Sequence, residues 1–237
     1  MSEAGDPVTA ASSGTFFFVH VMKTAGLSLG EHIDANFPPE QRYPTPGDPP
    51  LDYMVINALR VAVDARRDEV RLWRGHFPFF VTSFVPEAVT LSIVREPVAR
   101  TISMLAQYRL QNLPDLTLEA VYDDEYVQSR MLGNHQTKVF SMREEDAAGT
   151  YLKPIEIDER RLAAAKVNLG RVDLLGVTER FSSFVQQLHE RYGWRIAEMP
   201  RVNIGESVEI SPSLRQRIVT DTSLDAELYE HALGLVR

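Results

Sequence analysis

The stretch FFFVHVMKTAGLS, residues 16–28, combines two patterns that together indicate a fold class. Five of its first six residues are apolar, and a continuous run of aromatic and β-branched side chains is typical of a strand buried on both faces. From Gly26 to Asn36 the spacing becomes helical, with Leu29 and Ile33 four residues apart. The sequence therefore predicts a buried strand, a short turn of small and hydroxylated residues, and a helix.

The same alternation of strand and helix continues along the chain. Further strands are predicted within residues 71–77, 88–94 and 172–177, and helices over 54–66, 97–110, 158–168 and 179–192, after Ser211 and after Thr222. This order favours an α/β protein with a three-layer, P-loop-like fold, in which helices flank a central parallel sheet.

Local signals set several boundaries within this pattern. Pro97 suits the first turn of its helix, where the missing N–H costs nothing. Thr178 is the expected N-cap of the helix over 179–192, and Gly193 ends that helix. Six prolines in residues 37–50 predict a loop.

The length and composition are those of one globular domain. The chain has 237 residues and a net charge of −8, which does not favour nucleic acid or an anionic membrane as partner. It has no cysteine, which excludes disulfides, zinc–thiolate sites and a cysteine nucleophile, and no convincing cluster of metal ligands. We expect a disordered tail over 1–14, one domain over 15–237, no membrane span and a cytoplasmic location.

The turn after the first strand has the chemistry of a phosphate site. Backbone N–H groups and the positive end of a helix dipole converge there, Lys23 adds a charge, and Thr24 and Ser28 add hydroxyl donors. Gly26 allows a ligand to approach the backbone closely. The spacing is not that of GxxxxGK[ST], because the lysine opens the turn, so an ATP or GTP P-loop fits poorly. The alternative is an ordinary turn with a solvated lysine.

A second basic segment, TLSIVREPVARTISM, covers residues 90–104. Arg95 follows a predicted strand, and Ser103 lies two turns into the next helix, on the side that Arg100 also shares. An arginine and a serine near a helix start can hold a second phosphate. The alternative is an Arg95 that pairs with Glu96 or another acid, beside a Ser103 that faces solvent.

The two segments together resemble the sulfotransferases that use 3′-phosphoadenosine-5′-phosphosulfate (PAPS). HVMKTAGLSL and IVREPVARTISM are similar to the two charged motifs of the carbohydrate branch, of the heparan sulfate 2-O type. Because the sequence shows no membrane anchor and no cysteine, we expect a soluble bacterial member of that branch. RGHFPF (74–79), GNHQTKVFS (133–141), residues 174–194 and VNIG (202–205) are similar to further segments of that family. Met22 and Leu27 depart from it, where a proline and a threonine are usual.

This resemblance implies a role for each matched residue. The first loop would hold the 5′-phosphosulfate through the run Lys23, Thr24, Ala25, Gly26, Leu27 and Ser28. Arg95 and Ser103 would hold the 3′-phosphate, and the product nucleotide would be adenosine 3′,5′-bisphosphate (PAP). Lys23 would stabilise charge on the leaving oxygen, without a metal. His76 is our choice for the base that activates the acceptor hydroxyl, with Glu31 as the competitor.

Other residues are assigned only loosely by the resemblance. Asn134 and Gln136 would orient other groups or line the acceptor side, and His135, in a predicted loop, would lie near them. The acceptor would be a hydroxyl of a sugar, glycolipid or small metabolite. A nucleotide-dependent phosphotransferase and a non-catalytic nucleotide-binding protein are the alternatives, and the oligomeric state cannot be read from the sequence.

Overall fold

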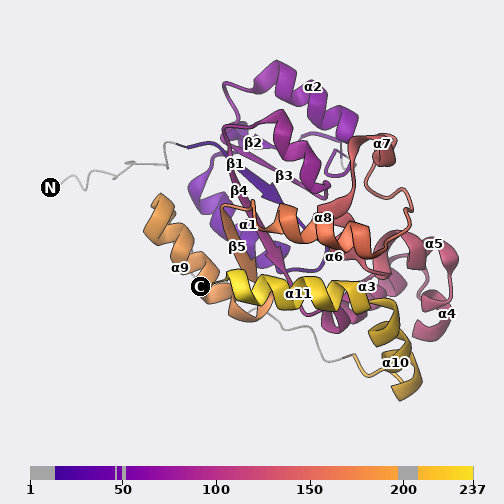
Figure 1. Cartoon of the computed structure of the whole chain (residues 1–237). Helices are drawn as coiled ribbons and strands as arrows, with labels where there is room; N and C mark the ends of the chain where they lie inside the picture. Colours follow the sequence, from indigo (N-terminus) through magenta and orange to yellow (C-terminus); the bar gives the residue numbers. More distant parts are fainter. Residues whose placement is uncertain (1–13, 46, 50–51, 197–207, 237) are drawn as a thin grey trace, which may run out of the picture.

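The computed structural model describes residues 14–45, 47–49, 52–196 and 208–236. Its sheet has five strands in the order β2-β3-β1-β4-β5, and all neighbouring pairs are parallel. The strands are β1 (Phe16–Val19), β2 (Arg42–Tyr43), β3 (Leu72–Gly75), β4 (Val89–Val94) and β5 (Leu174–Val177). Helices cover both faces of this sheet, so the predicted α/β class is confirmed (Figure 1).

The helices with predicted counterparts agree closely with their expected ranges. They are α1 (Gly26–Asn36), α2 (Ile56–Arg66), α3 (Pro97–Asn112), α8 (Glu159–Leu169), α9 (Phe181–Tyr192), α10 (Pro212–Asp221) and α11 (Ser223–Leu235). Four short helices were not predicted: α4 (Leu118–Tyr122), α5 (Glu125–Val127), α6 (His135–Ser141) and α7 (Glu144–Ala147). A π-helical turn, Gln128–Leu132, precedes α6.

The sheet separates two apolar cores because successive side chains of a strand point to opposite faces. Phe17 and Val19 of β1 contact a core that includes side chains of α2, α6, α8 and α11. Phe16 and Phe18 contact the other core, formed with α1 and α9. All four strand residues are buried, as expected of a strand covered on both sides. A third cluster joins α3, α4, the π-helical turn and α10.

Two local predictions were wrong. The proline-rich segment 37–50 is not only a loop: it contains a 3-10 turn, Pro39–Gln41, and the edge strand β2, whose Arg42 and Tyr43 pair with Leu72 and Trp73. Proline is tolerated beside an edge strand, so its abundance concealed this short strand. Thr178 does not cap α9; it begins a 3-10 turn, Thr178–Arg180, and its hydroxyl donates to the Val94 carbonyl.

Gly193 ends α9 as predicted, in the left-handed region at φ 71°. Ser211 caps α10 by accepting from the Leu214 N–H. The VNIG segment at 202–205 and the tail over residues 1–13 lie outside the described residues. No helix in the described part of the chain is both long and apolar enough to cross a bilayer.

Candidate active site

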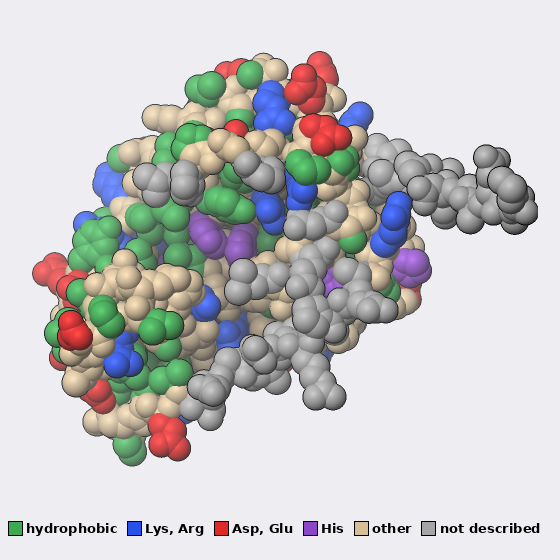
Figure 2. All heavy atoms as spheres, turned by 180° about the vertical axis from the view of Figure 1, so that it is seen from behind, with side chains coloured by type: hydrophobic (Ala, Val, Ile, Leu, Met, Phe, Trp, Pro, Cys, Tyr) green, Lys and Arg blue, Asp and Glu red, His purple; other side chains and the backbone are tan. Residues whose placement is uncertain are grey.

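Three predicted site segments meet at the carboxyl ends of the parallel strands. The loops that carry Lys23, His76 and Arg95 follow β1, β3 and β4, which are neighbours in the sheet. After β1 the chain crosses to β2 on one side, whereas after β4 it continues to β5 on the other. Parallel sheets bind ligands at such switch points, outside the carboxyl ends of the strands. Figure 2 shows histidine side chains with lysine and arginine around them on this molecule's rear face.

The first loop has an unusual backbone. Lys23 and Ala25 both have φ of 68°, in the left-handed region that residues other than glycine rarely adopt. The Thr24 side chain is fully buried, and its hydroxyl donates to the Val21 carbonyl at 2.8 Å. Thr24 therefore stabilises the turn through a buried hydrogen bond. Strained residues of this kind concentrate at functional sites.

Helix α1 begins without a side-chain cap. Ala25 is its N-cap, no acidic residue lies in its first turn, and its first backbone bond runs from Leu29 N–H to the Ala25 carbonyl. Helix geometry leaves the N–H groups of Gly26, Leu27 and Ser28 without an acceptor inside the helix. These N–H groups and the helix dipole can together stabilise an anion.

Gly26 is required by the packing of this turn. A Cβ on Gly26 would lie 1.9 Å from Nε2 of His20, which is far inside any van der Waals contact. His20 itself stacks on Phe18, with ring centroids 5.3 Å apart. The absence of a side chain at position 26 therefore allows the His20 ring to lie against the start of α1.

The Lys23 ammonium lies beside the second basic segment. Its Nζ donates to Oε1 of Gln107, on α3, at 2.6 Å. Burial lowers the pKa of Lys23, and the nearby Arg95 charge lowers it further. Ser103 lies one helical turn before Gln107, so it belongs to the side of α3 that faces the first loop.

Arg95 joins the two basic loops. One of its guanidinium nitrogens donates to the Lys23 carbonyl at 3.1 Å. Arg95 does not pair with Glu96, because the Glu96 carboxylate accepts from the N–H groups of Val98 and Ala99 and so caps α3. The ion pairs formed by described side chains include neither Lys23 nor Arg95.

Arg100 does not share the exposed side of Ser103, contrary to the helical-spacing argument. Its side chain is fully buried and donates to the carbonyls of Met131 and Leu132 in the π-helical turn. Burial lowers its pKa to about 10. Arg100 therefore stabilises the π-helical turn and is not a phosphate ligand on the surface of α3.

The His76 ring is held through one of its two nitrogens. Its Nδ1 lies 2.8 Å from the His20 carbonyl oxygen, which can only accept, so Nδ1 carries the proton and Nε2 of the neutral ring keeps a free lone pair. Burial lowers the pKa of His76, although the bond to the His20 carbonyl raises it in part. The neutral form needed by a base is therefore favoured at neutral pH.

His20, which sequence reasoning did not place among the site residues, lies beside His76. Its ring lies 4.4 Å, centroid to centroid, from that of His76. Burial holds its pKa well below the ordinary value, and the charges of His76, Arg74 and Lys23 act in the same direction. Its position directly after the predicted first strand was the available signal in the sequence.

The segment around Asn134 lies against the second loop. Gln136 exchanges two hydrogen bonds with the backbone of Arg95, and His135 begins α6, where its side chain is fully buried. His135 is therefore not in a loop; its nearest ring neighbour is Tyr151, with centroids 5.9 Å apart. Burial lowers the pKa of His135 well below its usual value.

Two predicted residues are placed only by their backbone. Leu27 and Glu31 lie in the first two turns of α1, and their side chains are outside the described atoms. Ser28, in the first turn, is partly exposed beside them. The roles predicted for Leu27 and Glu31 stay predictions.

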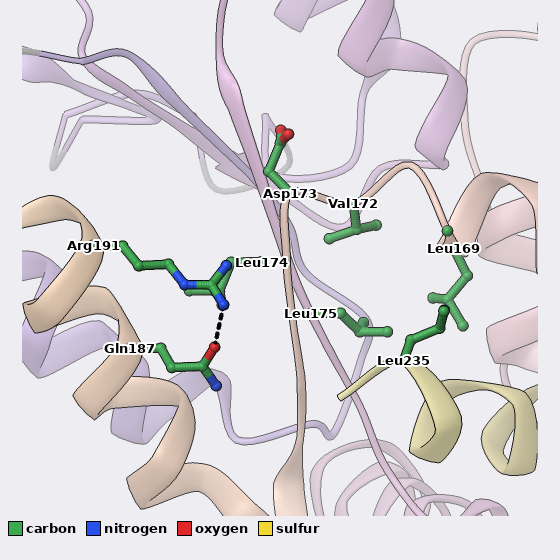
Figure 3. Close-up of a pocket in the computed structure, with 9 residues that line it drawn as sticks. Leu169, Val172, Asp173, Leu174, Leu175, Gln187, Arg191 and Leu235 are labelled. Carbon is green, nitrogen blue, oxygen red and sulfur yellow. Dashed lines mark hydrogen bonds between the residues drawn. The ribbon is translucent and has the colours of Figure 1, made fainter. Parts of the chain in front are cut away.

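A pocket of about 250 Å³ lies at the other end of the sheet, beside the amino end of β5. Leucines from α8, β5 and α11 line it, together with Gln187 and Arg191 of α9, whose side chains bond to each other at 2.8 Å (Figure 3). Asp173, at the amino end of β5, also contributes. This pocket is separate from the loops at the carboxyl ends. Among the described residues, no three histidine or acidic side chains gather as a metal site.

No protein-family model matches the chain, and no curated protein sequence matches it either. Among solved structures, the chain is similar to mouse sulfotransferase SULT7A1 complexed with PAP, with 17% identity and a TM-score of 0.45. The alignment covers 90% of this chain and 65% of that one, so the chain spans less than two thirds of that protein. So loose a likeness does not assign a family.

Proposed function

We propose that this protein is a PAPS-dependent sulfotransferase that transfers a sulfuryl group to an acceptor hydroxyl. The observation that carries the proposal is the meeting of Lys23, Arg95 and His76 on loops after three neighbouring strands. Two cationic side chains, an uncapped helix start and a neutral imidazole fit a ligand with two phosphate-type groups and a reacting hydroxyl.

The nucleotide would span both basic loops. The N–H groups of Gly26 to Ser28 and the Lys23 ammonium would bind the 5′-phosphosulfate, with Ala25 and Leu27 contributing through the backbone. Arg95 and Ser103 would bind the 3′-phosphate through their side chains, since Glu96 already occupies N–H groups at the start of α3. PAP would be the product that remains in this site.

The transfer is an in-line displacement at sulfur. The acceptor oxygen forms a new S–O bond, the bond from sulfur to the bridging phosphate oxygen breaks, and PAP leaves with that electron pair. Lys23 stabilises the charge that grows on the bridging oxygen, which lowers the energy of the transition state more than that of the bound substrate. Nε2 of His76 takes the proton of the acceptor hydroxyl.

Two variants test whether His76 or Glu31 is the general base. We expect His76→Ala to lower the rate of PAP release from PAPS and acceptor by about 10²–10⁴-fold, as for loss of a general base. Glu31→Gln would leave most of the rate. Turnover retained in His76→Ala together with turnover lost in Glu31→Gln would reverse the assignment.

Finer parts of the proposal rest on the sequence alone. They are one sulfotransferase domain over residues 15–237, membership of the carbohydrate branch of heparan sulfate 2-O type, a bacterial source and a cytoplasmic location. The acceptor would carry its hydroxyl on a sugar, a glycolipid or a small metabolite.

Calorimetric titration with PAP, and separately with ATP and magnesium, tests the nucleotide. We expect the wild type to bind PAP and to bind ATP at least about tenfold more weakly, because ATP lacks the 3′-phosphate. Arg95→Ala should weaken PAP binding by about 1.5–3 kcal/mol, the usual contribution of charged hydrogen bonds. Tighter binding of ATP with magnesium, or no binding of either nucleotide, would contradict the proposal.

A further inference from the structure

We propose that Gln136 and Asp225 are positioning residues of the nucleotide site, through which helix α11 fixes the backbone of Arg95. This inference rests on the proposed role of Arg95 as a ligand of the 3′-phosphate. Neither residue is expected to touch the reacting atoms. Their effect would be on where the Arg95 guanidinium is presented.

Gln136 holds both polar groups of the Arg95 backbone. The Arg95 N–H donates to Oε1 of Gln136 at 2.9 Å, and Nε2 of Gln136 donates to the Arg95 carbonyl at 2.8 Å. Strand β4 ends one residue earlier, at Val94. The amide of Gln136 thus supplies the two bonds that a neighbouring strand would otherwise make, and it fixes the first residue of the loop.

Asp225 in turn holds Gln136. The Asp225 carboxylate is fully buried and accepts from the Gln136 N–H at 3.0 Å and from the Thr137 N–H at 2.7 Å. The backbone N–H of Asp225 donates to Oδ1 of Asn134 at 2.9 Å, so the starts of α6 and α11 are bonded in both directions. Burying a carboxylate is costly unless it is hydrogen-bonded, which makes this contact specific in geometry.

A continuous series of bonds therefore reaches from α11 to the first loop. It runs from Asp225 to the Gln136 backbone, from the Gln136 side chain to the Arg95 backbone, and from the Arg95 guanidinium to the Lys23 carbonyl. Each bond is 2.8–3.1 Å long. These bonds therefore connect the start of α11 with the residue that is proposed to bind the 3′-phosphate.

The first test compares two nucleotides on Gln136→Glu. The substitution keeps the shape of the side chain, but its carboxylate cannot donate to the Arg95 carbonyl. We expect the dissociation constant of PAP to rise about tenfold and that of 5′-AMP, which lacks the 3′-phosphate, to change less than about twofold. Gln216→Glu, at an exposed position of α10, adds the same charge and should change neither value.

The second test is a double-mutant cycle with Asp225→Asn. If Asp225 acts through Gln136, the losses of PAP affinity in the two single variants will not add in the double variant. Equal losses for PAP and 5′-AMP, additive losses, or unchanged PAP binding in folded variants would each overturn the inference. If wild type itself fails to bind PAP, the proposed function fails and this inference falls with it.

Amide hydrogen exchange on the wild type provides a measurement that needs no variant to fold. The Arg95 N–H should exchange as slowly as the amides inside β4, because Gln136 holds it as a strand would. Exchange at the rate of an open loop amide would contradict the positioning role directly.

Discussion

The two strand-to-helix turns of the site begin their helices in opposite ways. At the start of α1, Ala25 offers no side-chain cap and the first turn holds no acidic residue. At the start of α3, the Glu96 carboxylate accepts from two backbone N–H groups and Pro97 occupies the first helical position. One turn leaves its N–H groups open, whereas the other satisfies them within the chain.

We expect this difference to give the two turns different roles in binding the proposed nucleotide. The first turn can hold an anion through its backbone, with Lys23 as an added charge. In the second turn only the side chains of Arg95 and Ser103 can bind an anion. Binding by a guanidinium depends more strictly on the geometry of the phosphate than binding by a helix N-terminus does. We therefore expect the first turn to determine the chemistry and the second turn to determine which nucleotide binds.

Of the two turns, the first should show the larger effect. Lys23→Ala should lower the rate of sulfuryl transfer by about 10²–10³-fold, the usual cost of removing one group that stabilises transition-state charge. Its effect on the dissociation constant of PAP should be smaller, because the backbone N–H groups remain. Initial rates of PAP release and calorimetry on the same preparation measure both. Equal losses in rate and in binding would contradict the division between the two turns.

The backbone of the first turn can be changed separately from its lysine. Gly26→Ala places a Cβ against the His20 ring, so the turn must shift, and PAP affinity should fall by about tenfold or more. Gly30→Ala is the matched control: it lies in the same helix with nothing within 4 Å, and alanine should stabilise the helix by up to about 1 kcal/mol. Calorimetry and thermal unfolding compare the pair. Unchanged PAP binding in Gly26→Ala would show that this backbone is not part of the site.

The cap of the second turn should matter for stability more than for binding. Glu96→Ala should reduce the free energy of unfolding by about 1 kcal/mol, as for loss of an N-cap, because the N–H groups of Val98 and Ala99 lose their acceptor. Urea unfolding measures this loss, and PAP titration of the same variant should change little. Much tighter PAP binding in Glu96→Ala would mean that the start of α3 can also hold a phosphate, which would remove the contrast between the turns.

The smallest effect expected is on the dependence of the rate on pH. Burial lowers the pKa of His76, so its neutral, basic form persists below pH 6.5 and is lost only as the pH falls through the lowered value. The acid limb of the rate should therefore lie below pH 6.5 and should disappear in His76→Ala. The lowered pKa values of His76 and His20 also mean that the unfolded chain binds more protons in this range, so stability should fall as the pH falls below 6.5. An acid limb above pH 6.5 would exclude His76 as the base.

The sequence predicted the regular elements better than the contacts between them. The buried run of β1 and the helical spacing after Gly26 are local patterns, and both were confirmed. The edge strand β2 was missed because two residues beside several prolines carry too weak a pattern. The burial of Arg100 and His135 was missed because it depends on the π-helical turn and α6, which no local periodicity indicates.

In the site, too, the features that depend on local sequence patterns were predicted, and the contacts between distant segments were missed. The loops with Lys23 and Arg95 could be predicted because each follows a clear strand, and strand order brings them together. The ring contact of His20 with His76 depends on the pairing of β1 with β3, which are more than fifty residues apart in the chain. The bonds from Gln136 to Arg95 and from Asp225 to Gln136 join still more distant segments, so only the folded chain reveals them.

Phosphorus-31 NMR of bound PAP tests the contrast between the two turns most directly, because the 3′- and 5′-phosphates give separate resonances. We expect Arg95→Ala to shift the 3′-phosphate resonance and to leave the 5′-phosphate resonance close to its wild-type position, and Lys23→Ala to do the reverse. Both resonances shifting equally in both variants, or the two variants exchanging their effects, would contradict the assignment of one phosphate to each turn.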